Sequence, residues 1–249
     1  MNGEVYDLCK LTLHANQALQ SNTDFIPLEK DYIGERKFVF SQGFGFTKHA
    51  EEWFHVCRKR GLTSVILLLP TKVKDRGLLG FANASRAYLA LVRKDGSVSC
   101  LVPTWTYVKE KKLWNVVYRE TEWTDAPKNL PVFNDETEAF KAVLSEIKEL
   151  AQTIGEPFFA DCFDTTLKIL EGDPTAEYRD LFPGLKEPYH RILNAVSKAD
   201  VFGAMGSWND SPPYEAQEKG LKDEYDRLSD ALLRLIRVNL MYAVNTCYS

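Results

Sequence analysis

The apolar residues of the chain recur at two spacings, one typical of helices and one typical of strands. Residues 4–20 and 47–60 each repeat apolar side chains three and four positions apart, which predicts two helices. The expected buried side of the second helix consists of Ala50, Trp53, Phe54 and Cys57. Thr47 suits the N-cap of this helix because its hydroxyl can accept a first-turn amide, and Gly61 suits the left-handed stop at its end.

Two short strands flank the second helix. Residues 37–42 alternate in character, with Phe38 and Phe40 on one side. Residues 64–69 form a nearly unbroken aliphatic run, which is typical of a strand covered on both faces. The succession of strand, helix and strand over 37–69 therefore predicts a βαβ-like unit with a right-handed parallel crossover.

The pattern then changes to that of an antiparallel meander over residues 86–122. Asp95 and Gly96 stand between two strand patterns and form a strong hairpin signal. A second hairpin is expected across the charged turn 109–112. Pro103 interrupts the strand pattern between the two hairpins, so we expect a bulge or a bend there.

Beyond this meander the chain has helical periodicity throughout. A loop over 125–131, rich in Pro, Asn and Asp, separates the two regions. Helices are predicted over 135–153, 158–171, 188–199 and 221–246, with a short helix starting at Pro212. The expected fold class is α+β: a small mixed sheet with an antiparallel meander, followed by an α-helical C-terminal region. The expected division is 1–130 for the α+β region and 131–249 for the helical region packed on it.

Composition narrows the class of protein. The chain has 249 residues, of which 45% are hydrophobic and 27% charged, a balance typical of folded proteins. Its five cysteines are scattered and never form a CxxC pair, which indicates free thiols in a reducing compartment. The N-terminus lacks the pattern of a secretory signal, and the longest apolar run is too short to cross a bilayer. We therefore expect a soluble, cytoplasmic protein without a membrane partner.

Charge is distributed unevenly. Basic residues exceed acidic ones over 61–132, and acidic residues exceed basic ones over 133–249. The pI of about 5.7 argues against nucleic-acid binding, which usually needs a basic domain with a clustered patch. We interpret the asymmetry as two subdomains with differently solvated faces.

Histidine and carboxylate residues form two ExxH pairs. Glu52 precedes His55, and Glu187 precedes His190. Two such pairs on facing bundle helices, with further glutamates, would build a di-iron carboxylate site. The first pair lies outside any long bundle helix, and Pro188 interrupts the second. Solvated helix faces are therefore the favoured interpretation, metal binding is the weak alternative, and no cofactor is expected.

Gly43 and Gly45 stand between a predicted strand and a predicted helix. Amides at a helix N-terminus can hold a phosphate. Lys48 occupies the place of the third glycine of a dinucleotide fingerprint, so that pattern is not met. A tight turn is the favoured interpretation of these glycines, with an anion site as the alternative.

The meander is rich in aromatic residues, among which Trp105 and Trp114 are candidate binding residues. Aromatic side chains on a sheet face can stack on bases or on a planar ligand. The alternative is that they form the face of the sheet that packs on helices, because strands favour aromatic residues for packing alone.

The loop over 203–214 holds two glycines, two prolines and several binding-type side chains. Its candidate binding residues are Trp208, Asn209, Asp210 and Tyr214. In the structural alternative, glycine supplies positive φ angles, Trp208 fills the interior of the helical region, and Asp210 or Ser211 caps the next helix.

No catalytic signature surrounds any serine or cysteine of the chain. The leading hypothesis is a non-catalytic binding or interaction protein of the bacterial cytoplasm, such as an inhibitor or immunity-type module whose partner is another protein. The alternative is a small enzyme, hydrolase-like or metal-dependent, that acts on an anionic small molecule. Whether the chain is an enzyme is left open, and no oligomeric state is indicated. A histidine near two carboxylates in a pocket would favour the enzyme, and an exposed apolar patch at the meander or at 203–214 would favour the interaction protein.

Overall fold

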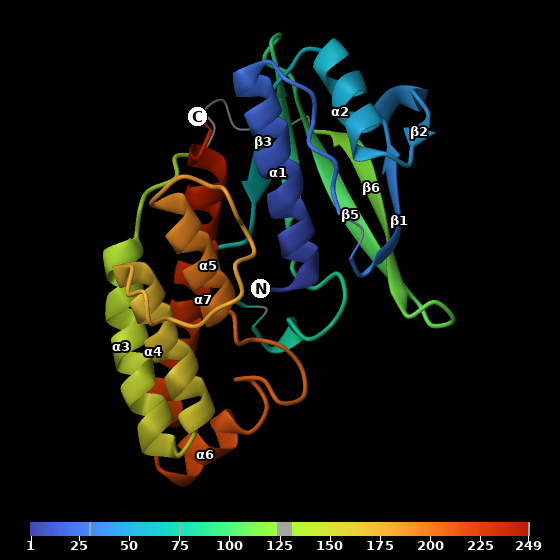
Figure 1. Ribbon diagram of the computed structural model, residues 1–249. Helices are drawn as coiled ribbons and strands as arrows, with labels where there is room; N and C mark the ends of the chain where they lie inside the picture. Colours follow the sequence, from blue (N-terminus) through green and yellow to red (C-terminus); the bar gives the residue numbers. More distant parts are fainter. Residues whose placement is uncertain (30, 75, 124–130, 249) are drawn as a thin grey trace. The chain divides into compact units, whose positions relative to one another are not determined.

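The computed structural model describes residues 1–29, 31–74, 76–123 and 131–248 (Figure 1). These residues contain a six-stranded mixed sheet and α-helices that dominate the C-terminal half, so the predicted α+β class is confirmed. Among the described helices, none has the length and apolarity needed to cross a membrane. The loop predicted over 125–131 lies, apart from Pro131, outside the described residues.

The chain divides into two compact units. The sheet unit consists of residues 3–69, 85–132 and 244–249, and the helical unit consists of residues 1–2, 70–84 and 133–243. The division near residue 132 lies close to the boundary that the sequence predicts. Two segments depart from the expected division. Residues 70–84 belong to the helical unit, and residues 244–249 belong to the sheet unit.

In its described residues the sheet unit contains two α-helices and six strands. Its elements are α1 (Gly3–Ser21), β1 (Ile33–Val39), the 3₁₀ turn η1 (Ser41–Gly43), β2 (Phe46–Thr47), α2 (Ala50–Lys59), β3 (Leu62–Leu68), β4 (Tyr88–Arg93), β5 (Val98–Val108) and β6 (Leu113–Glu122). The helices predicted over 4–20 and 47–60 are present. The second begins later than expected because Thr47 lies in β2.

The strand order in the sheet is β2-β1-β6-β5-β4-β3. Strands β3 to β6 pair antiparallel in the order of the chain, and β1 pairs parallel with β6. The parallel crossover predicted over 37–69 is therefore wrong, although its strand, helix and strand are present. The meander pairs each strand with its sequence neighbour and leaves β6 and β3 as its two edges. β1 adds to the edge of β6, so it runs antiparallel to the distant β3.

The predicted meander is confirmed, but its predicted interruption at Pro103 is wrong. β5 runs unbroken from Val98 to Val108, and Pro103 stands opposite Tyr118 of β6. The last pair between β5 and β4 is Leu101 with Leu89. Pro103 thus lies beyond the last residue of β5 that pairs with β4, and a residue without an amide proton is tolerated at such an open edge.

Helices α1 and α2 lie on one face of the sheet and build its core (Figure 1). Phe38 of β1 stacks between Trp53 of α2, at 5.3 Å between ring centroids, and Tyr118 of β6, at 5.0 Å. All three rings are fully buried, and aromatic pairs at such distances add stability beyond the area they bury. The predicted buried side of α2 is confirmed, since Ala50, Trp53, Phe54 and Cys57 are its buried residues.

A buried ion pair joins α1 to the sheet. Arg36 of β1 donates to both carboxylate oxygens of Asp7, with Nη2 at 2.6 Å from Oδ1. The hydroxyl of Tyr118 donates to the same carboxylate. Asp7 is 3% exposed, so these donors replace the water that its charge would otherwise need.

Two asparagine side chains satisfy the free edge of β3. Asn16 of α1 donates to the carbonyl of Val65 at 2.7 Å and accepts its amide at 2.9 Å. Asn245, near the end of the last helix, makes the same pair of bonds with Leu67, at 2.9 Å and 2.8 Å. A carboxamide presents one donor and one acceptor, as a neighbouring strand does, so both residues complete an aliphatic edge that would otherwise invite pairing with another chain.

The helical unit contains five helices in the described part of the chain. They are α3 (Thr137–Ile154), α4 (Pro157–Glu171), α5 (Tyr189–Ala199), α6 (Pro212–Glu218) and α7 (Lys222–Thr246), with the 3₁₀ turn η2 (Arg76–Leu78) in the segment 70–84. All five correspond to predicted helices within a few residues. The last residues of α7, from Val244, belong to the sheet unit. The core of the helical unit includes Phe140, Leu144, Phe163 and Trp208, which are fully buried.

Replacing Asn16 with leucine should destabilise the protein. Asn16→Leu leaves the buried amide and carbonyl of Val65 without partners, and we expect a loss of about 2–4 kcal/mol of unfolding free energy. Urea denaturation followed by circular dichroism measures this loss. Gln20→Leu, an exposed position of the same helix, is the matched control. Equal urea concentrations at the unfolding midpoints of the two variants would show that Asn16 does not stabilise the edge of β3.

Candidate functional site

One buried carboxylate in the sheet unit holds two arginines. The side chain of Glu120, on β6, is 1% exposed. Arg60 Nη1 donates to Oε2 at 2.7 Å, and Arg93 Nη2 donates to Oε1. The hydroxyl of Ser99 donates to Oε1 at 2.8 Å, and the amide of Ser41 donates to Oε2 at 3.2 Å. Both oxygens of the carboxylate are thus fully used, by donors from four different parts of the chain.

The local structure explains why these groups meet. Arg60 is the C-cap residue of α2, where a cation is favoured by the helix dipole, and Gly61, with φ of 82°, turns the chain into β3. Arg93 ends β4 just before the hairpin that leads to β5. In the sheet register Leu101 is paired with Glu120, so Ser99 lies diagonally across from the carboxylate. The ends of these elements therefore meet over β6.

The charge of Glu120 is stabilised despite its burial. Burial by itself raises the pKa of a carboxyl group, and it is the largest influence here. The hydrogen bonds from Arg60, Ser99 and Ser41 act in the opposite direction and outweigh it, so the pKa of Glu120 lies below its ordinary value. Glu120 is therefore ionised at neutral pH and is a weak base.

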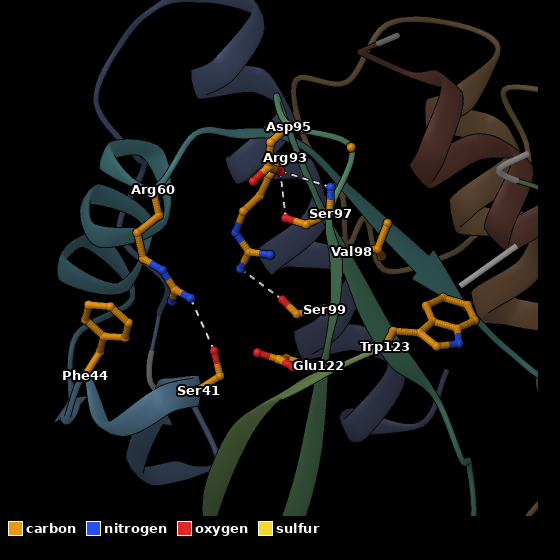
Figure 2. Close-up of a pocket in the computed structure, with 11 residues that line it drawn as sticks. Ser41, Phe44, Arg60, Arg93, Asp95, Ser97, Val98, Ser99, Glu122 and Trp123 are labelled. Atoms are coloured by element: carbon orange, nitrogen blue, oxygen red, sulfur yellow. Dashed lines mark hydrogen bonds between the residues drawn. The ribbon is translucent and has the colours of Figure 1, made fainter. Parts of the chain in front are cut away.

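A pocket of about 790 Å³ opens over these arginines (Figure 2). Its lining consists of Ser41, Phe44, Arg60, Arg93, Asp95, Gly96, Ser97, Val98, Ser99, Glu122 and Trp123. The side chains of Arg60 and Arg93 reach toward the space between η1 and the strands β5 and β6 (Figure 2). The pocket lies wholly within the sheet unit.

The arginines retain unused donors at this pocket. Arg60 donates from Nη1 to Glu120 and from Nη2 to the hydroxyl of Ser41, at 3.2 Å. Arg93 donates from Nη2 alone, to Glu120 and to Ser99. Within the described chain no acceptor is bonded to Nε of either arginine or to Nη1 of Arg93. Two cations share one buried anion, so the floor of the pocket carries one net positive charge.

Two carboxylates at the pocket's rim oppose this charge. Asp95 is exposed, and its Oδ1 accepts the amide and the hydroxyl of Ser97, at 2.9 Å and 2.7 Å. Glu122 is also exposed. Water and salt screen exposed charges far more than buried ones. The partly buried arginines are therefore screened less than these two carboxylates, which offer hydrogen-bond acceptors at the rim.

The turn predicted at Gly43 and Gly45 is confirmed. Both glycines have positive φ angles, of 77° and 84°. Strand β2 separates this turn from α2, which begins only at Ala50. The glycine amides are therefore not at the helix N-terminus that the alternative anion site would need.

Trp208, a candidate binding residue, lies in the interior of the helical unit. Its ring is fully buried and makes edge contacts with Phe159 and Phe163. Its Nε1 donates to the hydroxyl of Ser229 at 2.8 Å, and its carbonyl accepts the hydroxyl of Tyr225 at 2.5 Å. These contacts fit the structural alternative, in which Trp208 fills the helical region.

The other candidates of the 203–214 loop lie nearer the surface. Asn209 donates from Nδ2 to the carbonyl of Arg76 at 2.9 Å, which joins this loop to the segment 70–84. Asp210 accepts the amide of Gly206 at 2.7 Å and so closes a turn. Tyr214 is 61% exposed. A binding role for these residues stays a prediction.

Trp105 and Trp114 lie on the same face of the sheet. Trp105 is 4% exposed and stacks on Tyr32, with 6.4 Å between the ring centroids. Trp114 is half-buried, and its ring centroid lies 5.1 Å from that of Tyr107. Tyr107 is 45% exposed. Most of this aromatic face is thus the packing face, as the alternative interpretation expects, and only its end at Tyr107 is open.

The two ExxH pairs belong to different units, Glu52 and His55 to the sheet unit and Glu187 and His190 to the helical unit. In the second pair, His190 Nε2 lies 3.1 Å from Asp180 Oδ2, and His190 Nδ1 lies 3.6 Å from Glu187 Oε1. In the first pair, the carboxylate of Glu52 accepts the hydroxyl of Thr47. In the described ranges no group of three or more histidine, cysteine and acidic side chains could hold a metal ion.

Sequence reasoning missed Glu120, Arg60 and Arg93 as site residues. A usable signal was present, because Glu120 alternates with the buried Val116 and Tyr118 and so occupies an inward position of its strand. A charged residue at such a position needs a buried partner. The sequence did not show which cations would reach it.

The chain has no match among known protein families, curated proteins or solved structures.

Replacing Glu120 with glutamine tests this charge arrangement through the effect of pH. At pH 7 we expect Glu120→Gln to lose about 3 kcal/mol of stability, because two partly buried cations lose their buried anion. A carboxyl whose folded pKa is lowered stabilises the protein above its unfolded pKa of about 4.3, and this stabilisation is lost as pH falls through the folded value. The melting temperatures of wild type and variant should therefore converge as the pH falls from about 5 toward 2.

The exposed neighbour on the same strand provides the control. Glu122→Gln should change the melting temperature at pH 7 by little, because exposed charges contribute little to stability. A constant gap between wild type and Glu120→Gln across this pH range would contradict an ionised, stabilising Glu120.

Proposed function

We propose that this chain is a non-catalytic binding protein that takes a small anionic ligand in the pocket over Arg60 and Arg93. The observation that carries the proposal is the sharing of Glu120 by both arginines, which leaves guanidinium donors unused at a pocket of about 790 Å³. The pocket is within the size range of known small-molecule sites, roughly 300–1,000 Å³.

The chemistry of the floor supports an anion. Guanidinium groups present planar pairs of donors that match the oxygens of carboxylate or phosphate. Arg60 and Arg93 are both anchored by Glu120, so their donors are held in place before a ligand arrives. Such preorganisation lowers the entropic cost of binding.

The same groups support binding over catalysis. Glu120, which accepts the hydroxyl of Ser99, has a lowered pKa and is a poor general base. The hydroxyl of Ser97 donates to Asp95, which is exposed, and this exposed pair does not favour a catalytic serine either. We further propose a cytoplasmic location, since all five cysteines are free.

Anion titration tests the proposal. Isothermal titration calorimetry with inorganic phosphate, and separately with acetate, should detect binding to the wild type by at least one of the two. Arg60→Gln and Arg93→Gln should weaken that binding about tenfold or more, because a hydrogen bond to a charged group contributes about 1.5–3 kcal/mol. Arg58→Gln, an exposed arginine of the same helix, serves as the control.

A gain of affinity separates this result from misfolding. Glu122→Gln removes a negative charge from the rim and should strengthen anion binding about two- to fivefold, in line with the modest strength of exposed charge interactions. An unfolded variant cannot show such a gain. Absence of binding of both anions, or equal binding by all the variants, would refute the proposal.

A second candidate is the protein-interaction role, including that of a bacterial inhibitor or immunity-type module. The supporting observation lies in the helical unit, where Leu78, Phe81 and Met205 are 49%, 68% and 94% exposed. We call these three residues the apolar loop patch. Large apolar side chains gathered at a surface are typical of protein-binding sites.

Two loops carry the apolar loop patch, and a glycine brings them together. A Cβ at Gly80 would lie 2.7 Å from the backbone nitrogen of Ala204, so only glycine fits this contact. Phe81 and Met205 directly follow these two residues. One of the loops is the 203–214 segment, where an exposed apolar patch favours the interaction hypothesis.

Affinity capture tests this second candidate. The wild-type chain should retain a stoichiometric protein partner that the double variant Phe81→Ser, Met205→Ser loses, because these side chains supply the apolar contact area. Phe158→Ser is the control, since Phe158 is 68% exposed in the same unit but outside the patch. Retention of the same proteins by all three baits would contradict a docking role for the patch.

A further inference from the structure

Phe44 forms an apolar wall of the pocket and is presented to solvent. Its side chain is 60% exposed, and it stands between Gly43 and Gly45, which both have positive φ angles. A Cβ at either glycine would meet no atom within 4 Å. The conformation, rather than a lack of space, therefore requires glycine at these positions, and the resulting turn directs Phe44 outward.

The ring of Phe44 lies beside one of the two cations. The guanidinium carbon of Arg60 is 4.9 Å from the ring centroid, within the range of a cation–π contact. Figure 2 shows the ring next to Arg60 at the side of the pocket opposite Ser97 and Val98. Much of the ring remains open to a ligand that also reaches Arg60.

The pocket is too large for a bare anion. Its volume of about 790 Å³ is many times that of a water molecule, which occupies about 30 Å³ in the liquid. A phosphate or carboxylate group of a few heavy atoms on the arginines would leave most of this space unfilled. The size of the pocket therefore indicates a larger molecule.

The rim provides acceptors for the rest of such a molecule. Asp95 and Glu122 line the pocket with exposed carboxylates, which accept hydrogen bonds from N–H groups. The pocket thus combines cationic donors at its floor, an aromatic ring at one wall and anionic acceptors at its rim. A nitrogen-containing planar ring joined to an anionic group has the complementary chemistry.

We propose that the ligand is a small heteroaromatic anion, whose phosphate or carboxylate binds Arg60 and Arg93 and whose ring stacks on Phe44. This inference rests on the proposed anion-binding function and adds the ring to it. Stacking of a planar base on an aromatic side chain contributes enough affinity to be measured, about tenfold per ring or more.

The test compares ligands with and without a ring. In the phosphate arm, adenosine monophosphate is titrated against inorganic phosphate and adenosine, and in the carboxylate arm, indole-3-acetate is titrated against acetate. We expect the ring compound of one arm to bind at least about tenfold more tightly than its bare anion. The arm that shows the gain identifies the anionic group.

Two variants of the same turn assign the gain to Phe44. Phe44→Ala should remove the advantage of the ring compound and leave the affinity for the bare anion within about twofold. Phe46→Ala is the matched control, because Phe46 is 57% exposed on the adjoining β2 and does not line the pocket. It should leave both affinities unchanged.

Each outcome decides between the two proposals. If the bare anions bind and adding the ring brings no gain, or if the gain survives in Phe44→Ala, the heteroaromatic inference is overturned while anion binding stands. If adenosine binds as tightly as its monophosphate, the anionic group contributes nothing and the inference is also overturned. If no ligand of either arm binds, both proposals fall.

Discussion

The sheet unit's pocket depends on the ionised carboxylate of Glu120. Holding the partly buried Arg60 and Arg93 near each other would be unfavourable without an anion between them, because like charges repel more strongly where little water screens them. Glu120 accepts from both, and Ser99 and the Ser41 amide occupy its remaining lone pairs. The same bonds fix the end of α2, the end of β4 and the start of η1. Glu120 therefore positions the walls of the pocket as well as its two cations.

A second constraint acts at the edge of the sheet formed by β3. β3 is aliphatic and terminal in the strand order, which would make it prone to pair with another chain. Asn16 and Asn245 satisfy its outward amides and carbonyls and leave the edge without open partners at Val65 and Leu67. At the other end of the sheet, β2 is only two residues long, and a short edge strand also limits such pairing. The two asparagines and the short β2 therefore both limit edge-to-edge pairing of this sheet.

The sequence anticipated parts of the candidate site by their local conformation. Gly43 and Gly45 predicted a tight turn, and the turn is present with Phe44 at its tip. The favoured structural interpretation of Trp208 as an interior residue fits its full burial. The arginines were overlooked because a cation near the end of a helix or strand is usually solvated, and nothing local distinguishes Arg60 from the exposed Arg58 two positions earlier.

The sequence by itself determined the helices, the meander strands and the α+β class, because their periodicities depend on residues within a few positions of one another. It misjudged β1, whose partner β6 lies far along the chain. It also misjudged the break at Pro103, which is absent because β5 pairs with β4 only as far as Leu101. The tertiary structure alone decided the pairing of β1, the assignment of 70–84 and 244–249 to their units, and the meeting of Arg60 and Arg93 at Glu120. Charges and strand edges find partners through space rather than along the chain, so no local pattern records which residues they will meet.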